Sequence, residues 1–239
     1  MANPTAAMLV IGDEILSGRT RDANMHYLAG ELTKHGISLA EVRIVPDVAS
    51  KIVETIQSLS REYGSVFTSG GIGPTHDDIT ADCIAEAFDK TIGVRDDARA
   101  LLQAHYDKSG QEFNEARQRM ARIPEGATLI ENPVSVAPGF VLENVYVMAG
   151  VPSVFQAMVA SIMPTLTGGD PVLSQTLRIE RGEGEIAGPL AEIAASYSDL
   201  SIGSYPYQRN GAYGANVVIR GTDGQRVDEA MARLAELFA

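Results

Sequence analysis

Short apolar segments that alternate with helical segments constrain the fold of this 239-residue chain more than any other feature. The run AAMLVI at 6–11 is continuously apolar and ends before Gly12, which is typical of a strand buried on both faces. From 24 to 35 the apolar residues recur at i, i+3, i+4 and i+7, the spacing of an amphipathic helix. The same order repeats with a strand at 39–45, a helix at 48–63 and a strand at 65–69. Because such alternation produces right-handed crossovers, the sequence predicts an α/β fold with a mostly parallel sheet between helices.

The next part of the chain predicts further helices and shorter strands in the same domain. Helices are expected at 80–88, 96–108, 112–122 and 153–163, with Pro124 stopping the third. Strands are expected at 128–131, 139–142 and 145–148, and Glu143-Asn144 is expected to form the tight turn of a hairpin.

A domain boundary is predicted at 167–171, where the turn-forming residues Thr-Gly-Gly-Asp-Pro follow one another without periodicity. The expected domains are therefore 1–168 and 172–239. The second is predicted to be a small α+β unit with strands at 175–180, 200–205 and 215–220 and helices at 185–197 and 227–238.

The composition excludes several classes of function. Nineteen basic and 31 acidic residues give a formal charge of −12, which opposes binding to nucleic acid. No apolar run approaches the roughly 18 residues of a membrane span, and the first residues lack the basic start of a secretory signal. The single cysteine, Cys83, cannot form an intramolecular disulfide. We therefore expect a cytoplasmic protein without nucleic-acid or membrane partners.

The segment TSGGIGPTHDDIT at 68–80 is the strongest local signal, because it joins a predicted buried strand to the start of a helix. In open α/β sheets, ligands bind at this place. Glycines let backbone N–H groups approach an anion, and a helix N-terminus favours negative charge, so the segment fits a phosphate or pyrophosphate. The alternative is a tight turn without a ligand. The segment matches neither a dinucleotide fingerprint nor a Walker A loop.

Acidic residues follow three predicted strands and favour a metal site. Asp77 and Asp78 lie beside the glycines, where their charge would repel a phosphate unless a divalent cation such as Mg²⁺ lay between them. Asp13 with Glu14 follows the first strand, and Asp47 follows the second. Parallel strands bring these acids to one edge of the sheet. Each acid could instead cap a helix, and both interpretations stay open.

Several weaker candidates have ordinary structural explanations. Asn24 could cap a helix or reach a polar edge of a ligand. The turns around Pro138-Gly139 and Gly150–Pro152 could approach a ligand or only end strands. No zinc-ligand spacing surrounds His76, and Cys83 is more typical of a small buried residue than of a nucleophile.

Five motifs together resemble the competence/damage-inducible protein A family. They are Gly12-Asp-Glu-Ile-Leu-x-Gly18, Asp22-x-Asn24, Ser69-Gly-Gly-Ile-Gly-Pro-Thr-x-Asp-Asp-x-Thr80, Ala137-Pro-Gly-Phe140 and Gly150-Val-Pro-Ser153. The resemblance spans 8–163 and implies the MoaB/Mog-like molybdopterin-binding fold, a three-layer sandwich. The motif Ile202-Gly-Ser-Tyr-Pro206 resembles the second domain of this family and a domain of eukaryotic FAD synthases.

The resemblance implies a metal-dependent pyrophosphatase that acts on a nucleotide, ADP-ribose above all, with FAD as another candidate. Related Mog-type enzymes adenylylate molybdopterin with acids that match Asp47 and Asp78, so molybdopterin is a second possible ligand. The resemblance also implies a dimer or trimer. The amidase domain of longer family members is expected to be absent.

Two departures from the family pattern favour an alternative, a pterin- or nucleotide-binding protein without catalysis. Val154 stands where the family has glutamate, and Ser135-Val136 replaces Gly-Thr. The hypothesis assigns catalysis to Asp78 and Asp47, and metal binding to Asp78, Asp77 and Asp47. Residues expected to bind phosphate or nucleotide are Ser69, Gly70, Gly71, Gly73, Thr75, Gly12, Asp13, Asn24, Pro138, Gly139, Gly150 and Pro152.

Overall fold

The computed structural model describes residues 3–209 and 211–238, and the chain divides into two compact units between Gly169 and Asp170. The first unit contains a six-stranded sheet with the order β2-β1-β3-β8-β7-β6 and a separate pair, β4 and β5. Its strands are β1 (Thr5–Ile11), β2 (Ser38–Val45), β3 (Ser65–Ser69), β4 (Ile92–Val94), β5 (Arg122–Pro124), β6 (Thr128–Ile130), β7 (Gly139–Leu142) and β8 (Val145–Met148). Its helices are α1 (Asp13–Leu16), α2 (Asn24–Lys34), α3 (Ala49–Glu62), α4 (Thr80–Ala87), α5 (Asp96–Ser109), α6 (Glu115–Gln118) and α7 (Pro152–Ile162), with 3₁₀ turns at Arg119–Ala121 and Met163–Thr165.

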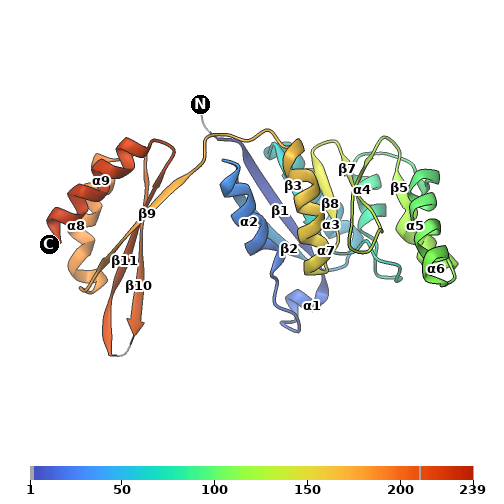
Figure 1. The fold of residues 1–239 in the computed structure, drawn as a ribbon, viewed down its shortest axis with the longest axis horizontal. Helices are drawn as coiled ribbons and strands as arrows, with labels where there is room; N and C mark the ends of the chain where they lie inside the picture. The colour runs from blue at the N-terminus through green and yellow to red at the C-terminus, as the bar shows by residue number, and fades with distance from the viewer. Residues whose placement is uncertain (1–2, 210, 239) are drawn as a thin grey trace. The chain divides into compact units, whose positions relative to one another are not determined.

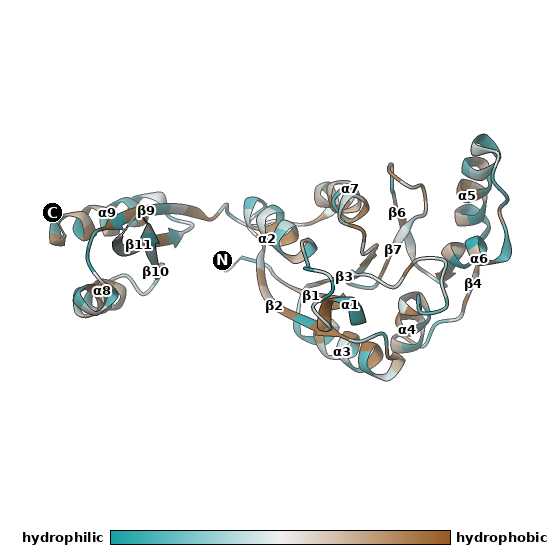
Figure 2. Ribbon diagram, turned by 90° about the horizontal axis from the view of Figure 1, so that it is seen from below, coloured by the Kyte–Doolittle hydropathy of each residue, from teal (hydrophilic) through white to brown (hydrophobic). Residues whose placement is uncertain are grey.

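Helices cover both faces of the six-stranded sheet, which confirms the predicted α/β class (Figure 2). Leu28 and Leu32 of α2 pack with Phe155 of α7 on one face. On the other face, Ile56 of α3 and Ile84 of α4 belong to a second apolar cluster. Strands β2, β1, β3 and β8 are parallel, whereas β7 is antiparallel to both of its neighbours. The parallel strands therefore bring four carboxyl ends to one edge of the sheet.

The predicted helix at 112–122 is wrong over most of its length. Helix α6 covers only four residues, and β5 follows it after one 3₁₀ turn. The side chain of Asn114 caps α6 by accepting a hydrogen bond from the Arg117 amide at 3.1 Å, so the helix begins later than predicted. Pro124 ends the strand β5 rather than a helix. Strands of three residues such as β4 and β5 are too short to show a periodicity of two.

The predicted hairpin between β7 and β8 is present, and its turn is attached to α3. Glu143 has a φ of 51°, as a tight turn requires. The side-chain amide of Asn144 donates to the carbonyl oxygens of Ser60 and Tyr63 at 3.0 and 2.8 Å, at the end of α3. This turn therefore fixes the end of the helix and the start of β8 together.

The second unit is a three-stranded antiparallel sheet with two helices packed on one face (Figure 1). Its elements are β9 (Leu173–Ile179), α8 (Glu183–Ser196), β10 (Ser201–Arg209), β11 (Ala212–Gly221) and α9 (Gly224–Leu237). The strand order is β10-β11-β9. This matches the predicted α+β class and order of elements.

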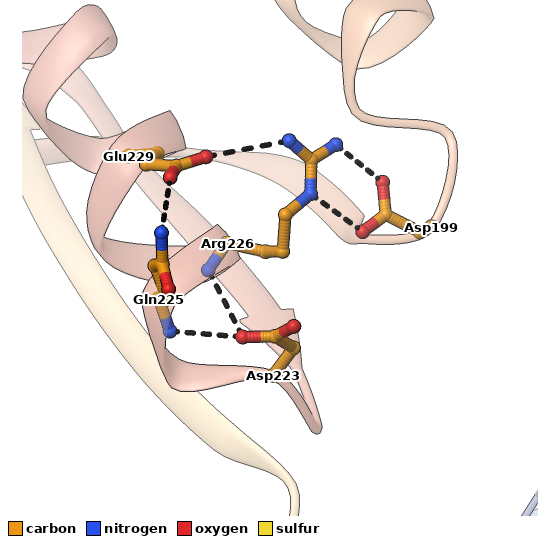
Figure 3. Close-up of polar contacts among 5 residues, drawn as sticks. All are labelled: Asp199, Asp223, Gln225, Arg226 and Glu229. Carbon is orange, nitrogen blue, oxygen red and sulfur yellow. Dashed lines mark hydrogen bonds and ion pairs between the residues drawn. The ribbon is translucent and has the colours of Figure 1, made fainter.

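Polar contacts around Arg226 fix the start of α9 (Figure 3). The Asp223 carboxylate accepts hydrogen bonds from the amides of Gln225 and Arg226 at 3.0 and 3.2 Å, which caps the helix. The guanidinium group of Arg226 donates two hydrogen bonds to Asp199, at 3.0 and 2.9 Å. These bonds connect α9 to the loop that follows α8.

No helix in the described part of the chain is long and apolar enough to cross a membrane.

Alanine substitutions at Gly70 and, as a control, at Gly30 test how closely the strand ends meet. Gly70 has a φ of +108°, and a Cβ there would lie 2.2 Å from the Ile11 carbonyl oxygen. Gly30 lies in α2 with no atom within 4 Å of an added Cβ. Gly70→Ala should therefore lower the free energy of unfolding by about 3 kcal/mol or more, whereas Gly30→Ala should raise it by about 0.5–1 kcal/mol. Urea denaturation of both variants checks this. Equal effects would contradict the close approach at Gly70.

Candidate functional site

A cavity of about 370 Å³ lies at the carboxyl ends of the parallel strands. Its wall combines the glycine loop, the acidic residues that follow β1 and β2, and loops from the second half of the unit. The lining residues are Ile11, Gly12, Glu14, Asp47, Gly70, Gly71, Ile72, Gly73, Asp77, Asp78, Met120, Asn132, Ser135, Ala137, Ala149, Gly150, Val151 and Val154. This volume is within the range of small-molecule sites.

The glycine loop turns sharply between β3 and α4 and is held by Thr80. The Thr80 hydroxyl donates to the Gly70 carbonyl oxygen and the Thr80 amide donates to the Gly71 carbonyl oxygen, both at 3.0 Å. Gly71 has a φ of +70°, and a Cβ there would lie 2.1 Å from the Thr80 hydroxyl oxygen. At Gly73 a Cβ would lie 2.6 Å from Asp78 Oδ2. Side chains are therefore excluded, and backbone alone forms this part of the cavity wall.

Two of the acids are held in place by backbone amides. Asp78 Oδ2 accepts hydrogen bonds from the Thr75 amide at 2.8 Å and from the Thr75 hydroxyl at 2.5 Å. Asp47 Oδ2 accepts a hydrogen bond from the Asp13 amide at 3.0 Å. Thr75 and Asp13 are exposed and are not among the cavity-lining residues, so the structure places them as supports for Asp78 and Asp47.

The charged residues that line the cavity are all acidic. Glu14, Asp47, Asp77 and Asp78 line it, and no described lining residue is basic. Burial raises the pKa of Asp47, the nearby charges of Asp13, Glu14 and Asp77 add to this increase, and the Asp13 amide opposes it. Within residues 3–209 and 211–238, no three acids, histidines or cysteines form a ready metal cage. A cation here would therefore need oxygen ligands from a bound molecule as well.

Asn24 and Ser69 line a smaller neighbouring pocket of about 60 Å³, together with Gly150 and Pro152. Asn24 is buried, and its Nδ2 donates to Ser69 Oγ and to the Gly150 carbonyl oxygen, both at 2.7 Å. These bonds tie the start of α2 to the ends of β3 and β8. The sequence predicted Asn24 as a cap or a ligand contact. Asp22, in the predicted capping segment Asp22-Ala-Asn24, accepts a hydrogen bond from the Met25 amide at 3.0 Å near the start of α2, so Asn24 is not the cap; its contact with a ligand stays a prediction.

Other predicted residues lie around the cavity with structural roles. Pro138 lines a neighbouring pocket of about 20 Å³, together with Gly71 and Gly73 of the glycine loop. Gly139 is buried, and a Cβ there would lie 2.4 Å from the Val147 carbonyl oxygen, so packing of the hairpin accounts for it. The side chain of His76 is 99% exposed. Burial raises the pKa of the Cys83 thiol to about 11, which makes it a poor nucleophile.

The far wall contains residues that the sequence analysis did not assign. Asn132 Nδ2 donates to Ser135 Oγ at 2.6 Å and to the Ala137 carbonyl oxygen at 2.8 Å, which folds the loop over the cavity. Val136 has a φ of 67°, a strained conformation for a β-branched residue. Met120 reaches the cavity from the 3₁₀ turn before β5 and Asn132 from the loop after β6, and no periodicity marks them. Val154 is 8% exposed and lines the cavity, so this part of the wall is apolar.

Comparison with known families matches the two units separately. Residues 7–168 match the probable molybdopterin binding domain. Residues 171–239 match the middle domain of FAD synthase.

Individual relatives match all or part of the chain. A protein of Archaeoglobus fulgidus is 31% identical over 231 residues, which cover 97% of this chain and 96% of the relative. A probable FAD synthase of Caenorhabditis elegans is 30% identical over 98% of this chain, but the chain spans only 50% of that relative. The crystal structure of CinA from Thermoplasma acidophilum, whose function is given as unknown, has a TM-score of 0.63 and 30% identity. It covers 69% of this chain and 99% of its own. The chain belongs to the molybdopterin-binding-domain family, in its competence/damage-inducible protein A (CinA) branch, and continues into a unit of the FAD synthase middle-domain type.

Proposed function

We propose that this chain is a metal-dependent hydrolase of pyrophosphate-linked nucleotides, with ADP-ribose and FAD as candidate substrates. One observation carries the proposal. A cavity of about 370 Å³ has a glycine backbone cradle on one side and four carboxyl groups around it, without a basic lining residue among those described. A pyrophosphate would be repelled from such a cavity unless a divalent cation bound with it.

The donor set fits Mg²⁺. Carboxylate oxygens from Asp47, Asp77 and Asp78 are hard ligands of the kind that Mg²⁺ prefers. Mg²⁺ commonly binds through one or two carboxylates together with substrate phosphates, which agrees with the lack of a complete cage among the described residues. A bound cation would neutralise charge on the phosphate oxygens and lower the pKa of an attacking water.

The residues of the chain then supply position and orientation. The backbone of Gly70, Gly71 and Gly73 holds the phosphates, and the Thr75 hydroxyl and amide fix Asp78. Water forms a bond to one phosphorus while the bridging P–O bond breaks, and the released proton passes to solvent. ADP-ribose would give AMP and ribose 5-phosphate, and FAD would give FMN and AMP. Catalysis of this kind rests mainly on positioning and charge neutralisation.

The relatives support a nucleotide ligand. FAD contains a pyrophosphate, and the probable FAD synthase of C. elegans contains a region similar to nearly this whole chain. The family model names molybdopterin, a pterin that also carries phosphate. This supports two alternatives, molybdopterin adenylyltransfer and ligand binding without turnover. Val154 favours the second, because it replaces a carboxylate of the family by an apolar group in the cavity wall.

Asp78→Asn provides the first test. The variant keeps an oxygen that can accept from Thr75 but removes the negative charge, so AMP release from ADP-ribose or FAD should fall about 100-fold or more. Product chromatography after incubation with Mg²⁺, Mn²⁺ or Co²⁺ measures this. Asp96→Asn is the control, because it removes one exposed carboxylate at the start of α5 and should keep full activity.

The outcomes separate the candidate functions. Equal turnover by Asp78→Asn and wild type would contradict the hydrolase mechanism. Saturable binding without products would favour the binding protein. AMP transfer from ATP to molybdopterin would favour the adenylyltransferase.

Asp47→Asn tests the charge of the cavity through stability. The pKa of Asp47 is raised in the folded state, so the folded protein binds this proton more tightly than the unfolded chain. The Asp47 carboxyl group therefore contributes to the free energy of unfolding at low pH. This contribution is lost as the pH rises from about 3.8 through the raised pKa of Asp47. At pH 7 with EDTA, Asp47→Asn should therefore raise the free energy of unfolding by about 0.5–1 kcal/mol. Mg²⁺ with nucleotide should stabilise wild type more than the variant. A destabilised variant in EDTA would contradict this account.

A further inference from the structure

The second unit leaves one face of its sheet without a covering helix. Ile179, Val217 and Ile219 point to the helix-covered face and form its core with α8 and α9. Their strand neighbours point to the opposite face, because successive side chains alternate across a sheet. On β9 and β10 the residues of this open face include Arg178, Tyr205 and Tyr207. We call this uncovered face of the sheet the open face.

Two tyrosine rings of the open face lie over glycines. A Cβ at Gly203 would be 3.3 Å from the hydroxyl oxygen of Tyr205, so this ring lies across the backbone two residues earlier. A Cβ at Gly214 would be 2.6 Å from the hydroxyl oxygen of Tyr207. Gly203 and Tyr205 belong to the Ile-Gly-Ser-Tyr-Pro motif, which the catalytic proposal leaves without a role. Glycines here give the rings room to lie against the sheet, and Tyr205 remains 49% exposed.

The open face is basic although the chain is acidic. Arg178 lies over the Tyr207 ring at 4.4 Å and its Nε donates to the Tyr207 hydroxyl at 2.8 Å. Arg220 of β11 is exposed on the same face. The described strand residues of this face include no acid. Glu180, just beyond β9, lies 3.6 Å from Arg178 in an exposed pair that water screens. An anion therefore meets favourable charge here, in contrast to the cavity of the first unit.

We propose that the open face binds a planar heteroaromatic ring that carries a phosphate, the chemistry of a flavin or purine mononucleotide. The ring stacks on Tyr205. Arg178, which is level with Tyr205 in the strand register, attracts the phosphate, and Arg220, level with Ser201, adds to the positive charge of the face. Aromatic stacking on an exposed tyrosine is worth about 1–3 kcal/mol per base in proteins that bind nucleotides in this way. The residues of this site belong to the second unit and those of the cavity to the first, and the inference does not depend on the hydrolase proposal. A structural alternative is that Tyr205 only covers the glycine of a sheet-edge strand.

FMN titrated into the full chain tests the proposal, because stacking on tyrosine quenches flavin fluorescence. The titration is done in EDTA, so that a metal-dependent phosphate site in the first unit does not contribute. Wild type should quench FMN saturably. Tyr205→Leu should weaken binding about tenfold, and Tyr205→Phe should retain it. Tyr213→Leu is the matched control. Tyr213 on β11 is 64% exposed, but its place in the strand pairing puts it on the helix-covered face of the sheet.

Further probes identify the ligand chemistry. Riboflavin, which lacks the phosphate, should bind more weakly than FMN, and Arg220→Gln should reduce this difference. AMP should compete with FMN. Asp78→Asn should bind FMN as wild type does, which separates this site from the catalytic cavity. Activity lost in Asp78→Asn with FMN quenching retained would leave both proposals standing.

Several results would overturn the inference. They are absence of saturable quenching in wild type, equal weakening by Tyr205→Leu and Tyr213→Leu, or loss of binding in Asp78→Asn. A single-stranded oligoribonucleotide that bound far more tightly than FMN with the same dependence on Tyr205 would overturn the assignment to a mononucleotide. Lower stability of Tyr205→Leu with unchanged FMN binding would identify a purely structural tyrosine.

Discussion

The site depends on the contact of backbone with backbone at the end of β3. Gly70 lies so close to the Ile11 carbonyl oxygen that a side chain would overlap it, and a Cβ at Gly150 would lie 3.2 Å from Gly70 Cα. The ends of β1, β3 and β8 therefore meet without side chains between them. This contact lets the glycine loop, the acids after β1 and β2, and the loop after β8 enclose one cavity. A larger residue at this point would separate the walls of the site.

Repulsion between the carboxylates of that cavity lowers the stability of the folded protein and favours the binding of a cation. Four carboxyl groups share the cavity wall, and burial together with neighbouring charge raises the pKa of Asp47. The fold tolerates this repulsion because amides of Thr75 and Asp13 hold two of the carboxylates. A cation bound with a phosphate would relieve it. The open face of the second unit has the opposite charge, because Arg178 and Arg220 lie on it.

The sequence predicted the fold best where the apolar pattern was long. The β1–β3 region and its helices follow from continuous apolar strands and regular helical spacing, and the hairpin follows from its turn residues. The helix expected at 112–122 was wrong because the Asn114 cap and the two short strands override local helical propensity. The four-residue α1 was not predicted, because so short a helix has no periodicity.

The same limits apply to the cavity. Convergence of the acids on the glycine loop followed from parallel topology. Met120 arrives from a 3₁₀ turn and Asn132 from a loop, and no local pattern connects either of them to the site. The strained Val136 was also beyond sequence reasoning, because a β-branched residue disfavours its φ of 67°.

In the proposed function, a cation and a pyrophosphate bind this cavity together. Calorimetric titration of Mn²⁺ in the absence and presence of an ADP-ribose analogue with a methylene bridge between the phosphorus atoms measures this coupling directly. We expect Mn²⁺ alone to bind weakly and to bind at least about tenfold more tightly in the presence of the analogue. The affinity for the analogue should rise by the same factor when Mn²⁺ is present. Analogue binding of equal affinity in Mn²⁺ and in EDTA would contradict it.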